Sequence, residues 1–199
     1  MKAYKNLDYI DVENEVVIED AVIIVENGKF KKMGRDIEIP KEAEVIDLEG
    51  KTVLPGIIDA HIHSMLDASG DPHTTMENEN DAVTIIKAQK ALEKTLKAGV
   101  TYVRDLGGAD HYDLGLREAA SRGIFNGPRM QVAGRVITMT GGHGYRMGRE
   151  TDGVADARKA AREQLKAGVD VVKIMSTGGV MTKGVEPGSP QLSFEEIQA

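Results

Sequence analysis

The sequence predicts an α/β protein: a small β subdomain followed by the first half of a (β/α)8 barrel of the TIM type. Two observations support this fold. After Gly56, predicted strands alternate with predicted helices, an order typical of a parallel sheet covered by helices. In addition, the motif Leu-Lys-Ala-Gly-Val at residues 96–100 recurs at residues 165–169, and a predicted strand follows each copy. This recurrence indicates repeated βα units, of which we count four between residues 55 and 199.

Residues 1–54 are expected to form an incomplete, sandwich-like β subdomain. Strands are predicted over four apolar runs: 21–25, 30–33, 45–48 and 52–54. Asn27-Gly28 suits the two left-handed positions of a type I′ hairpin turn, and Glu49-Gly50 is expected to turn the chain between the last two strands. So few strands do not enclose a core by themselves, and the subdomain therefore needs a packing partner.

Residues 55–199 are expected to form the first four βα units of the barrel. The strands are predicted at residues 57–63, 101–105, 130–133 and 171–174, and a short helix at 114–122. Asp81 and Asp152 are each expected to cap a longer helix, and Ser193 with Glu196 forms a capping box for the last one. The apolar faces of the two longer helices are predicted to carry Ile85, Ala88, Leu92 and Leu96, and Ala157, Ala161 and Leu165.

Four βα units leave the edges of a parallel sheet open, and soluble proteins avoid exposed sheet edges. A barrel closes with eight units and about 250 residues. We therefore interpret the sequence as the N-terminal half of a longer protein. A half-barrel completed by a second chain is the alternative.

The composition excludes several classes of protein. Hydrophobic residues make up 41% and charged residues 29%, a balance typical of a globular domain and not of a disordered chain. The formal net charge of -7 argues against a nucleic-acid partner. No apolar run is long enough to cross a membrane, and the first residues lack the apolar core of a signal peptide, so we expect a cytoplasmic protein without a membrane partner. Because the chain has no cysteine, a metal would require histidine or carboxylate ligands.

A pair of histidines is the sharpest local signal. In the predicted strand 57–63, residues two apart share a face, so Asp59, His61 and His63 point to the same side. Two imidazoles side by side at the carboxyl end of a barrel strand suit one divalent cation. The alternative is a pair of histidines satisfied by hydrogen bonds inside the barrel.

Lys173 is the second signal, because it interrupts an apolar strand that is expected to be buried. Burial favours the neutral amine, which can form a Schiff base or take up carbon dioxide as a carbamate that bridges two metals. Binding of phosphate, with Gly178-Gly179 nearby, is a third interpretation. The structural alternative is a lysine whose ammonium extends to the barrel mouth.

Four motifs carry a resemblance to a known family. Residues 55–63, Pro-Gly-Ile-Ile-Asp-Ala-His-Ile-His, resemble the first barrel strand of the amidohydrolase superfamily, and residues 99–107 resemble its second strand. Residues 140–144 and 172–180 resemble the branch of imidazolonepropionase-like proteins. That branch includes metal-dependent Xaa-Pro dipeptidases (prolidases) and carboxypeptidases that release a basic residue.

The resemblance implies a site with two divalent cations, most often zinc. By analogy, His61 and His63 bind the more buried ion, and Lys173, carbamylated to a carboxylysine, bridges both. The family's other ligands are two histidines from the fifth and sixth strands and an aspartate from the eighth, which is also the general acid and base. These positions lie beyond residue 199, so the catalytic residue is unknown here and the chain alone lacks a complete site.

Polar loops supply candidate substrate ligands. His143 lies between glycines, with Tyr145 and Arg146 beside it, and we expect His143 and Tyr145 to bind a substrate carboxylate at the barrel rim. A flexible polar loop without a ligand is the alternative interpretation.

Two other polar side chains are given structural interpretations. Residues 64–80 form a long polar stretch, typical of a lid or a disordered loop, in which His73 is expected to be solvated. Arg104 is expected to form a structural ion pair with Asp59.

The main hypothesis is a metal-dependent amidohydrolase that cleaves an amide or peptide bond with metal-activated water, as a dipeptidase or a carboxypeptidase does. Its partner is then a small molecule or a dipeptide, and the full-length protein is expected to form a homo-oligomer. The alternatives are an imidazolonepropionase-like hydrolase of a cyclic amide, a barrel lyase that uses Lys173, and an inactive fragment that acts as a scaffold.

Overall fold

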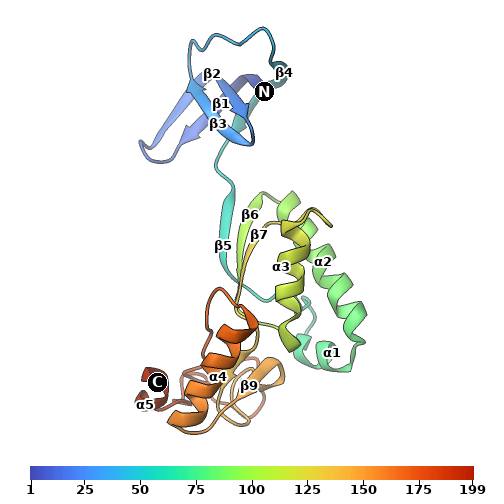
Figure 1. The fold of residues 1–199 in the computed structure, drawn as a ribbon, viewed down its shortest axis with the longest axis vertical. Helices are drawn as coiled ribbons and strands as arrows, with labels where there is room; N and C mark the ends of the chain where they lie inside the picture. The colour runs from blue at the N-terminus through green and yellow to red at the C-terminus, as the bar shows by residue number, and fades with distance from the viewer. The chain divides into compact units, whose positions relative to one another are not determined.

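The computed structural model describes residues 1–199 and divides into two compact units, Met1–Gly56 and Ile57–Ala199 (Figure 1). The first unit is a four-stranded sheet with the order β3-β2-β1-β4. Its strands are β1 (Lys2–Asp11), β2 (Val16–Glu26), β3 (Lys29–Gly34) and β4 (Glu44–Val53). β1 pairs in parallel with β4, and the other pairs are antiparallel. Leu7, Ala21 and Ile23 form its small core.

The two turns predicted in this unit have different outcomes. Asn27 and Gly28 both have positive φ, 52° and 73°, as a type I′ turn between β2 and β3 requires, which confirms that prediction. The turn predicted at Glu49-Gly50 is wrong, because β4 continues through it. Lys5 of β1 pairs with Asp47 and Leu7 pairs with Lys51, so residues 48–50 of β4 lie opposite the single residue Asn6 of β1. The left-handed residues therefore form a bulge within one strand.

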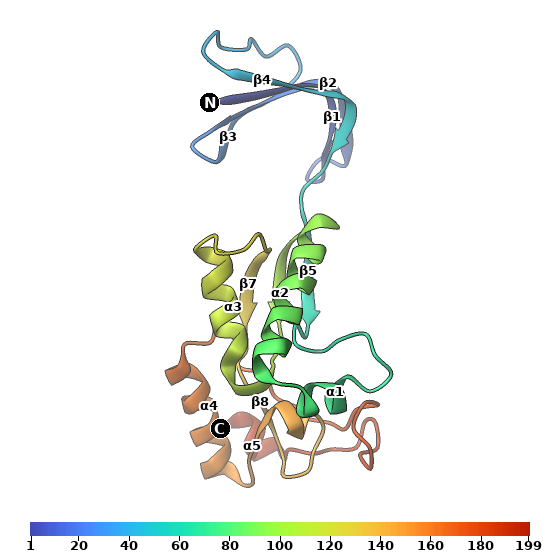
Figure 2. The same ribbon diagram turned by 90° about the vertical axis from the view of Figure 1, so that its right-hand side faces the viewer.

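The second unit is a half-barrel that begins with a parallel sheet, in the order β5-β6-β7. These strands are β5 (Ile57–Ile62), β6 (Val100–Asp105) and β7 (Arg129–Val132). Helices α2 (Asp81–Lys97) and α3 (Tyr112–Ser121) cover one face of this sheet (Figures 1 and 2). The core lies between them and includes Leu92, Val103, Leu116, Met130 and Val132.

The remaining elements follow β5, β6 and β7 at the carboxyl ends of the strands. They are α1 (Pro72–Asn78), η1 (Ala109–His111), β8 (Val136–Thr138), η2 (Tyr145–Met147), β9 (Gly148–Glu150), α4 (Val154–Ala167) and α5 (Phe194–Gln198). β8 pairs in parallel with β9. None of the helices combines the length and apolar character needed to cross a bilayer.

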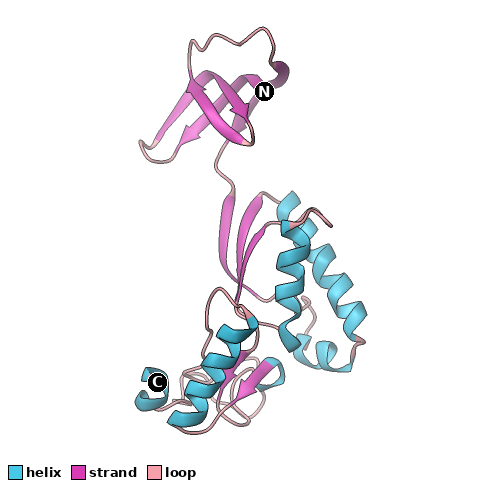
Figure 3. Ribbon diagram, in the orientation of Figure 1, coloured by secondary structure: helices cyan, strands magenta, loops and turns pink.

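One edge of the parallel sheet is unpaired. β5 pairs only with β6, and no strand lies on its other side (Figure 3). Ile57 and Ile58 are consequently 51% and 67% exposed, although their sequence is that of a buried strand. The open edge predicted from the count of βα units is therefore present at β5.

The fourth barrel strand, predicted at residues 171–174, is reduced to a single bridge between Ile137 and Ile174. The segment does follow the sheet, because Asp170 N–H donates to Val132 O (2.9 Å) and Ile137 N–H donates to Lys173 O (2.8 Å). These two partners belong to separate short strands, since the chain leaves β7 before it enters β8. A continuous ladder therefore does not form.

The helix caps differ from the prediction in two of three cases. Asn80, not Asp81, caps α2, and its side chain accepts from Ala82 N–H at 3.0 Å. Gly153 precedes α4 without a side-chain cap, because the Asp152 carboxylate accepts from the Thr140 hydroxyl at 2.5 Å instead. The capping box at the start of α5 is confirmed.

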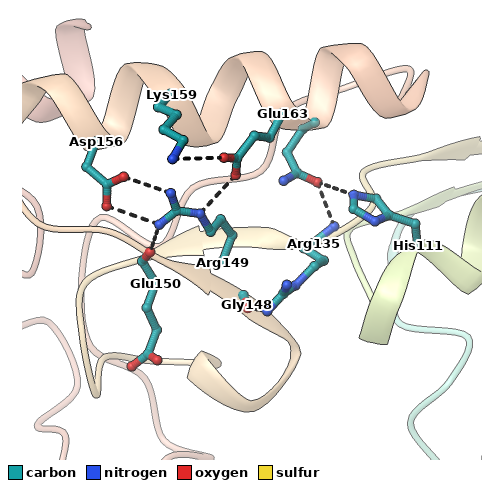
Figure 4. Close-up of polar contacts among 9 residues, drawn as sticks. His111, Arg135, Gly148, Arg149, Glu150, Asp156, Lys159 and Glu163 are labelled. Carbon is teal, nitrogen blue, oxygen red and sulfur yellow. Dashed lines mark hydrogen bonds and ion pairs between the residues drawn. The ribbon is translucent and has the colours of Figure 1, made fainter.

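The buried face of α4 is displaced from the predicted one. The buried residues are Ala157, Ala160 and Gln164, whereas Leu165 is 61% exposed. A polar network selects this face (Figure 4). The Gln164 side-chain oxygen accepts from Arg135 N–H (3.0 Å) and lies 2.7 Å from His111 Nε2.

Arg149 in β9 forms the other half of this network. Its guanidinium binds Asp156 at 2.7 and 3.0 Å and Glu163 at 2.9 Å, and both partners lie on α4 (Figure 4). Polar contacts thus hold α4 against β9. They select a face of the helix that differs from the one predicted by its apolar residues.

Candidate metal centre and adjoining pocket

His61, near the end of β5, and His63, directly after the strand, lie side by side. Their ring centroids are 5.4 Å apart, and the ring planes cross at 65°. His61 is exposed and His63 is half-buried. Burial is the main cause that lowers the pKa of both imidazoles, and the positive charge of Lys173 adds to it. A lowered pKa favours the neutral form, which is the form that binds metals.

The ring of His63 is fixed by a backbone contact. Its Nδ1 lies 2.8 Å from the carbonyl oxygen of Gly107. A carbonyl only accepts hydrogen bonds, so Nδ1 carries the proton and Nε2 keeps a free lone pair. This arrangement is common among metal-binding histidines, whose second nitrogen donates to a carbonyl or carboxylate.

Lys173 is half-buried on the segment next to β8. Burial lowers the pKa of its ammonium, and the nearby charge of Arg104 lowers it further. Its positive charge also lowers the pKa of His61, His63 and His143. No three histidine, aspartate or glutamate side chains come together as a ready cation site. The two imidazoles fit one side of such a site, and Lys173 is the group on this chain that could extend it.

Arg104 does not form the predicted ion pair with Asp59. Its Nε donates to the carbonyl oxygen of Ala60 at 2.8 Å, and Asp59 instead accepts from the N–H of His61 at 3.1 Å. Both contacts brace the backbone of β5 around His61. The long guanidinium side chain reaches across to the neighbouring strand, whereas the Asp59 carboxylate bonds within its own strand.

His143 lies in an ordered loop. Its N–H donates to the Gln191 side chain at 2.8 Å, and its Nδ1 lies 3.0 Å from the Thr182 hydroxyl. A Cβ atom on Gly179 would lie 2.5 Å from Nε2 of this ring, so only glycine permits this close approach. Tyr145 follows in η2 and is 36% exposed.

His73 is buried, not solvated as predicted. It is 5% exposed, and its Nδ1 has no hydrogen-bond partner. The reason is that part of the polar stretch folds as α1, with Asp71 as its N-cap and Pro72 in its first turn. Burial is the main cause that lowers the pKa of His73, followed by the charges of His143 and Arg146.

A polar pocket of about 100 Å³, open to solvent, lies between α1, η2 and the loop that follows Lys173. Its walls are formed by Asp71, His73, Thr74, Gly144, Tyr145, Arg146, Met181, Thr182 and Lys183. The structure therefore brings Tyr145 and Arg146 to this pocket together with His73, which the sequence analysis left outside the site. His143 lies directly behind it, through Thr182.

Asp105 is a buried carboxylate that the sequence analysis did not single out. It is 1% exposed, and burial raises its pKa from 3.8 to about 7. It accepts hydrogen bonds from Ser64 and Gly107, the residues that flank and hold His63. The signal available in the sequence was an aspartate at the end of an apolar predicted strand.

Comparisons with known proteins agree on one family. A model described as "Amidohydrolase family" matches residues 52–199. Ochratoxinase of Aspergillus niger is 24% identical over 210 residues, covering 91% of this chain and 43% of ochratoxinase. Dihydroorotase of Aquifex aeolicus is 56% identical over 41 residues, covering 21% of this chain and 10% of that enzyme.

Solved structures give the same result over nearly the whole chain. A prolidase complexed with N-methylphosphonate-L-proline superimposes with a TM-score of 0.89 and 29% identity, covering 99% of this chain and 52% of the prolidase. A Xaa-Pro dipeptidase with bound methionine in its active site gives a TM-score of 0.86 and 26% identity, covering 98% and 52%. The chain thus spans about half the length of these relatives.

Proposed function

Because this chain belongs to the amidohydrolase family, we propose that it supplies the first half of a metal-dependent hydrolase that cleaves an amide or peptide bond. The observation that carries the proposal is the pair of neighbouring imidazoles at the end of β5. Their ring centroids are 5.4 Å apart, and the contact of His63 Nδ1 with the Gly107 carbonyl places the proton on Nδ1 and leaves the lone pair on Nε2. Two neutral imidazoles at the carboxyl end of a parallel strand suit a divalent cation.

His61, His63 and Lys173 would hold the metal, and we propose zinc as the cation. The lowered pKa of Lys173 favours the neutral amine, which is the form that reacts with carbon dioxide to give a carbamate. The carbamate would provide two oxygen ligands to a pair of cations. Bound divalent cations polarise the substrate carbonyl and lower the pKa of water toward 7. The general acid and base, an aspartate in the family resemblance, lies outside residues 1–199.

The polar pocket is the proposed place for the part of the substrate beyond the scissile bond. It contains Tyr145, and His143 supports its wall through Thr182. Arg146, which also pairs with Glu77, and Lys183 line the pocket together with one carboxylate, Asp71. The two cationic groups favour a substrate with a free carboxylate. A dipeptide or an N-acylated amino acid has that chemistry. Relatives described as a prolidase and a Xaa-Pro dipeptidase support this substrate class.

The experiment measures metal content and amide hydrolysis in the full-length protein with His61→Ala combined with His63→Ala. We expect the double variant to lose bound zinc and turnover together. His111→Ala is the matched control, because its ring contacts Gln164 and not the pocket. Turnover by a double variant that retains its fold would contradict the proposal.

A lyase that forms a Schiff base on Lys173 is the second candidate, favoured by the lowered pKa of that amine. Borohydride distinguishes the two functions. A lyase would be inactivated by borohydride in the presence of a carbonyl substrate and would be unaffected by chelators. The metal-dependent hydrolase has the opposite pattern.

A further inference from the structure

One buried carboxylate holds both chain segments that fix His63. Asp105 ends β6, and its Oδ2 accepts from the N–H of Ser64 at 3.2 Å and from the Ser64 hydroxyl. Its Oδ1 accepts from the N–H of Gly107 at 3.2 Å. Ser64 directly follows His63, and the carbonyl of Gly107 accepts from His63 Nδ1. A single side chain therefore links the residue after His63 to the peptide that orients its ring.

The position of the Asp105 side chain requires a group that only accepts hydrogen bonds, because all of its hydrogen-bond partners there are donors. Two N–H groups and one hydroxyl converge on the two oxygens of Asp105. An amide side chain would direct an NH2 group at one of these donors and leave that donor without a partner. The charged group among the causes that shift the pKa of Asp105 is another acid, Asp113, which raises that pKa, so no counter-ion offsets the burial of this carboxylate. A buried acid without a counter-ion is costly, which argues that its contacts serve a specific arrangement.

We propose that Asp105 is a positioning residue for His63. By fixing Ser64 and Gly107, it keeps the proton of the imidazole on Nδ1 and leaves the lone pair of Nε2 free for a divalent cation. The hydrogen bond at one ring nitrogen determines which nitrogen is available to a metal. This inference rests on the proposed function, because it gives His63 a role as a metal ligand.

Asp113 provides a matched control within the same core. It is 0% exposed, and burial raises its pKa as it does that of Asp105. Its carboxylate accepts from Gly134 N–H at 2.7 Å and from Leu114 N–H at 2.9 Å, and it contacts neither Ser64 nor Gly107. Its charge is one of the causes that raise the pKa of Asp105, but its replacement removes none of the hydrogen bonds that Asp105 accepts from Ser64 and Gly107.

The experiment compares Asp105→Asn with Asp113→Asn in the full-length protein. Zinc affinity is measured by competition with a chromophoric chelator, and the tautomer of His63 is read from ¹⁵N–¹H correlation spectra of the metal-free protein labelled at histidine. We expect Asp105→Asn to weaken zinc binding by about 10- to 100-fold and to shift His63 away from the Nδ1–H tautomer. Asp113→Asn should leave both unchanged. Wild-type affinity and tautomer in Asp105→Asn would overturn the proposal.

Ser64→Ala keeps the test decisive if Asp105→Asn does not fold. This substitution removes one donor and leaves the buried carboxylate in place. We expect a smaller loss of zinc affinity with the same direction of tautomer change, and no change in either would overturn the proposal. The spectra of the metal-free protein test Asp105 independently of metal, so a wild-type protein that binds no zinc would contradict the proposed function alone.

Discussion

Nη1 of Arg146 donates a 2.7 Å hydrogen bond to Oγ1 of Thr74, which lies 72 positions earlier in the chain. The same guanidinium forms a 3.2 Å ion pair with Glu77 through Nε. Arg146 belongs to η2, and its two partners belong to α1. These contacts tie the helix that follows β5 to the loop that follows β8, and two of the residues, Thr74 and Arg146, form part of the pocket wall.

Arg146→Ala is expected to release α1 without unfolding the protein. Exposed ion pairs contribute little to global stability, so the midpoint of thermal unfolding should change little. The short helix α1 should open more often, which is measured as faster amide hydrogen exchange in residues 72–78. Arg122→Ala, which removes an exposed pair with Glu118, is the control and should leave exchange in α1 unchanged. Equal exchange in all three proteins would show that the contact does not hold the helix.

Arg149→Met is expected to weaken the attachment of α4 to β9. The guanidinium binds Asp156 and Glu163, and its side chain is 20% exposed. With allowance for solvent screening, its removal should lower the free energy of unfolding by about 1 kcal/mol at pH 7. Urea unfolding followed by circular dichroism measures this change. Arg158→Met, on an exposed position of the same helix, should have a negligible effect.

The pair of Arg149 and Asp156 should also produce a defined acid dependence. The hydrogen bond from Arg149 is the main cause that lowers the pKa of Asp156 from 3.8 to about 2. The folded state therefore binds fewer protons than the unfolded state between these values, and the stabilisation is fully present above about pH 4. As the pH falls to about 2, the stability difference between the wild type and Arg149→Met should shrink. A constant difference over this range in urea titrations would contradict the prediction.

Zinc is expected to stabilise the full-length protein. A ligand that binds only the folded state at 100 times its Kd raises the free energy of unfolding by about 2.7 kcal/mol. The midpoint of thermal unfolding should therefore rise on addition of zinc and fall after treatment with a chelator. His61→Ala should abolish the increase, whereas His111→Ala should retain it because its ring contacts Gln164. An equal increase in His61→Ala would place the zinc elsewhere.

Gly107→Ala is expected to lower the free energy of unfolding more than Gly123→Ala does. Both Gly107 and Gly123 have positive φ, 118° and 67°, so alanine is strained at either position. A Cβ atom at Gly107 would also lie 2.6 Å from Val136 Cγ1, whereas one at Gly123 would meet no atom within 4 Å. We expect a loss of about 1 kcal/mol for Gly123→Ala and roughly three times that for Gly107→Ala. Chemical denaturation of both variants tests this order.

The parallel strands and the longest helix could be predicted because each has an apolar period that packing preserves. β5, β6 and β7 lie within one or two residues of their predicted bounds, and α2 buries the predicted Ala88 and Leu92. The buried face of α4 could not be predicted, because polar contacts with other elements select it. Gln164 of α4 contacts His111, and Asp156 of α4 binds Arg149 of β9. A polar network of this kind leaves no periodic trace along the helix.

The part of the candidate site that could be predicted is the part whose geometry depends on a single strand. Alternation along β5 suffices to place His61 and His63 together, and the ring separation agrees with that placement. The burial of His73 depends on the folding of α1, to which it belongs, and the role of Asp105 depends on a contact with Ser64 across 41 positions. A charged residue in a polar stretch or at a strand end is usually solvated, so neither was recognisable from the sequence alone.

The strand that carries both histidines is also the one with a free edge. Its outer N–H and C=O groups are a template for a further strand, which would cover Ile57 and Ile58 and place its own side chains next to His61. If His61 and His63 bind the proposed metal, protection from aggregation and completion of the metal's surroundings depend on the same pairing event. The tendency to aggregate and the zinc content should consequently change together in any variant that alters this edge.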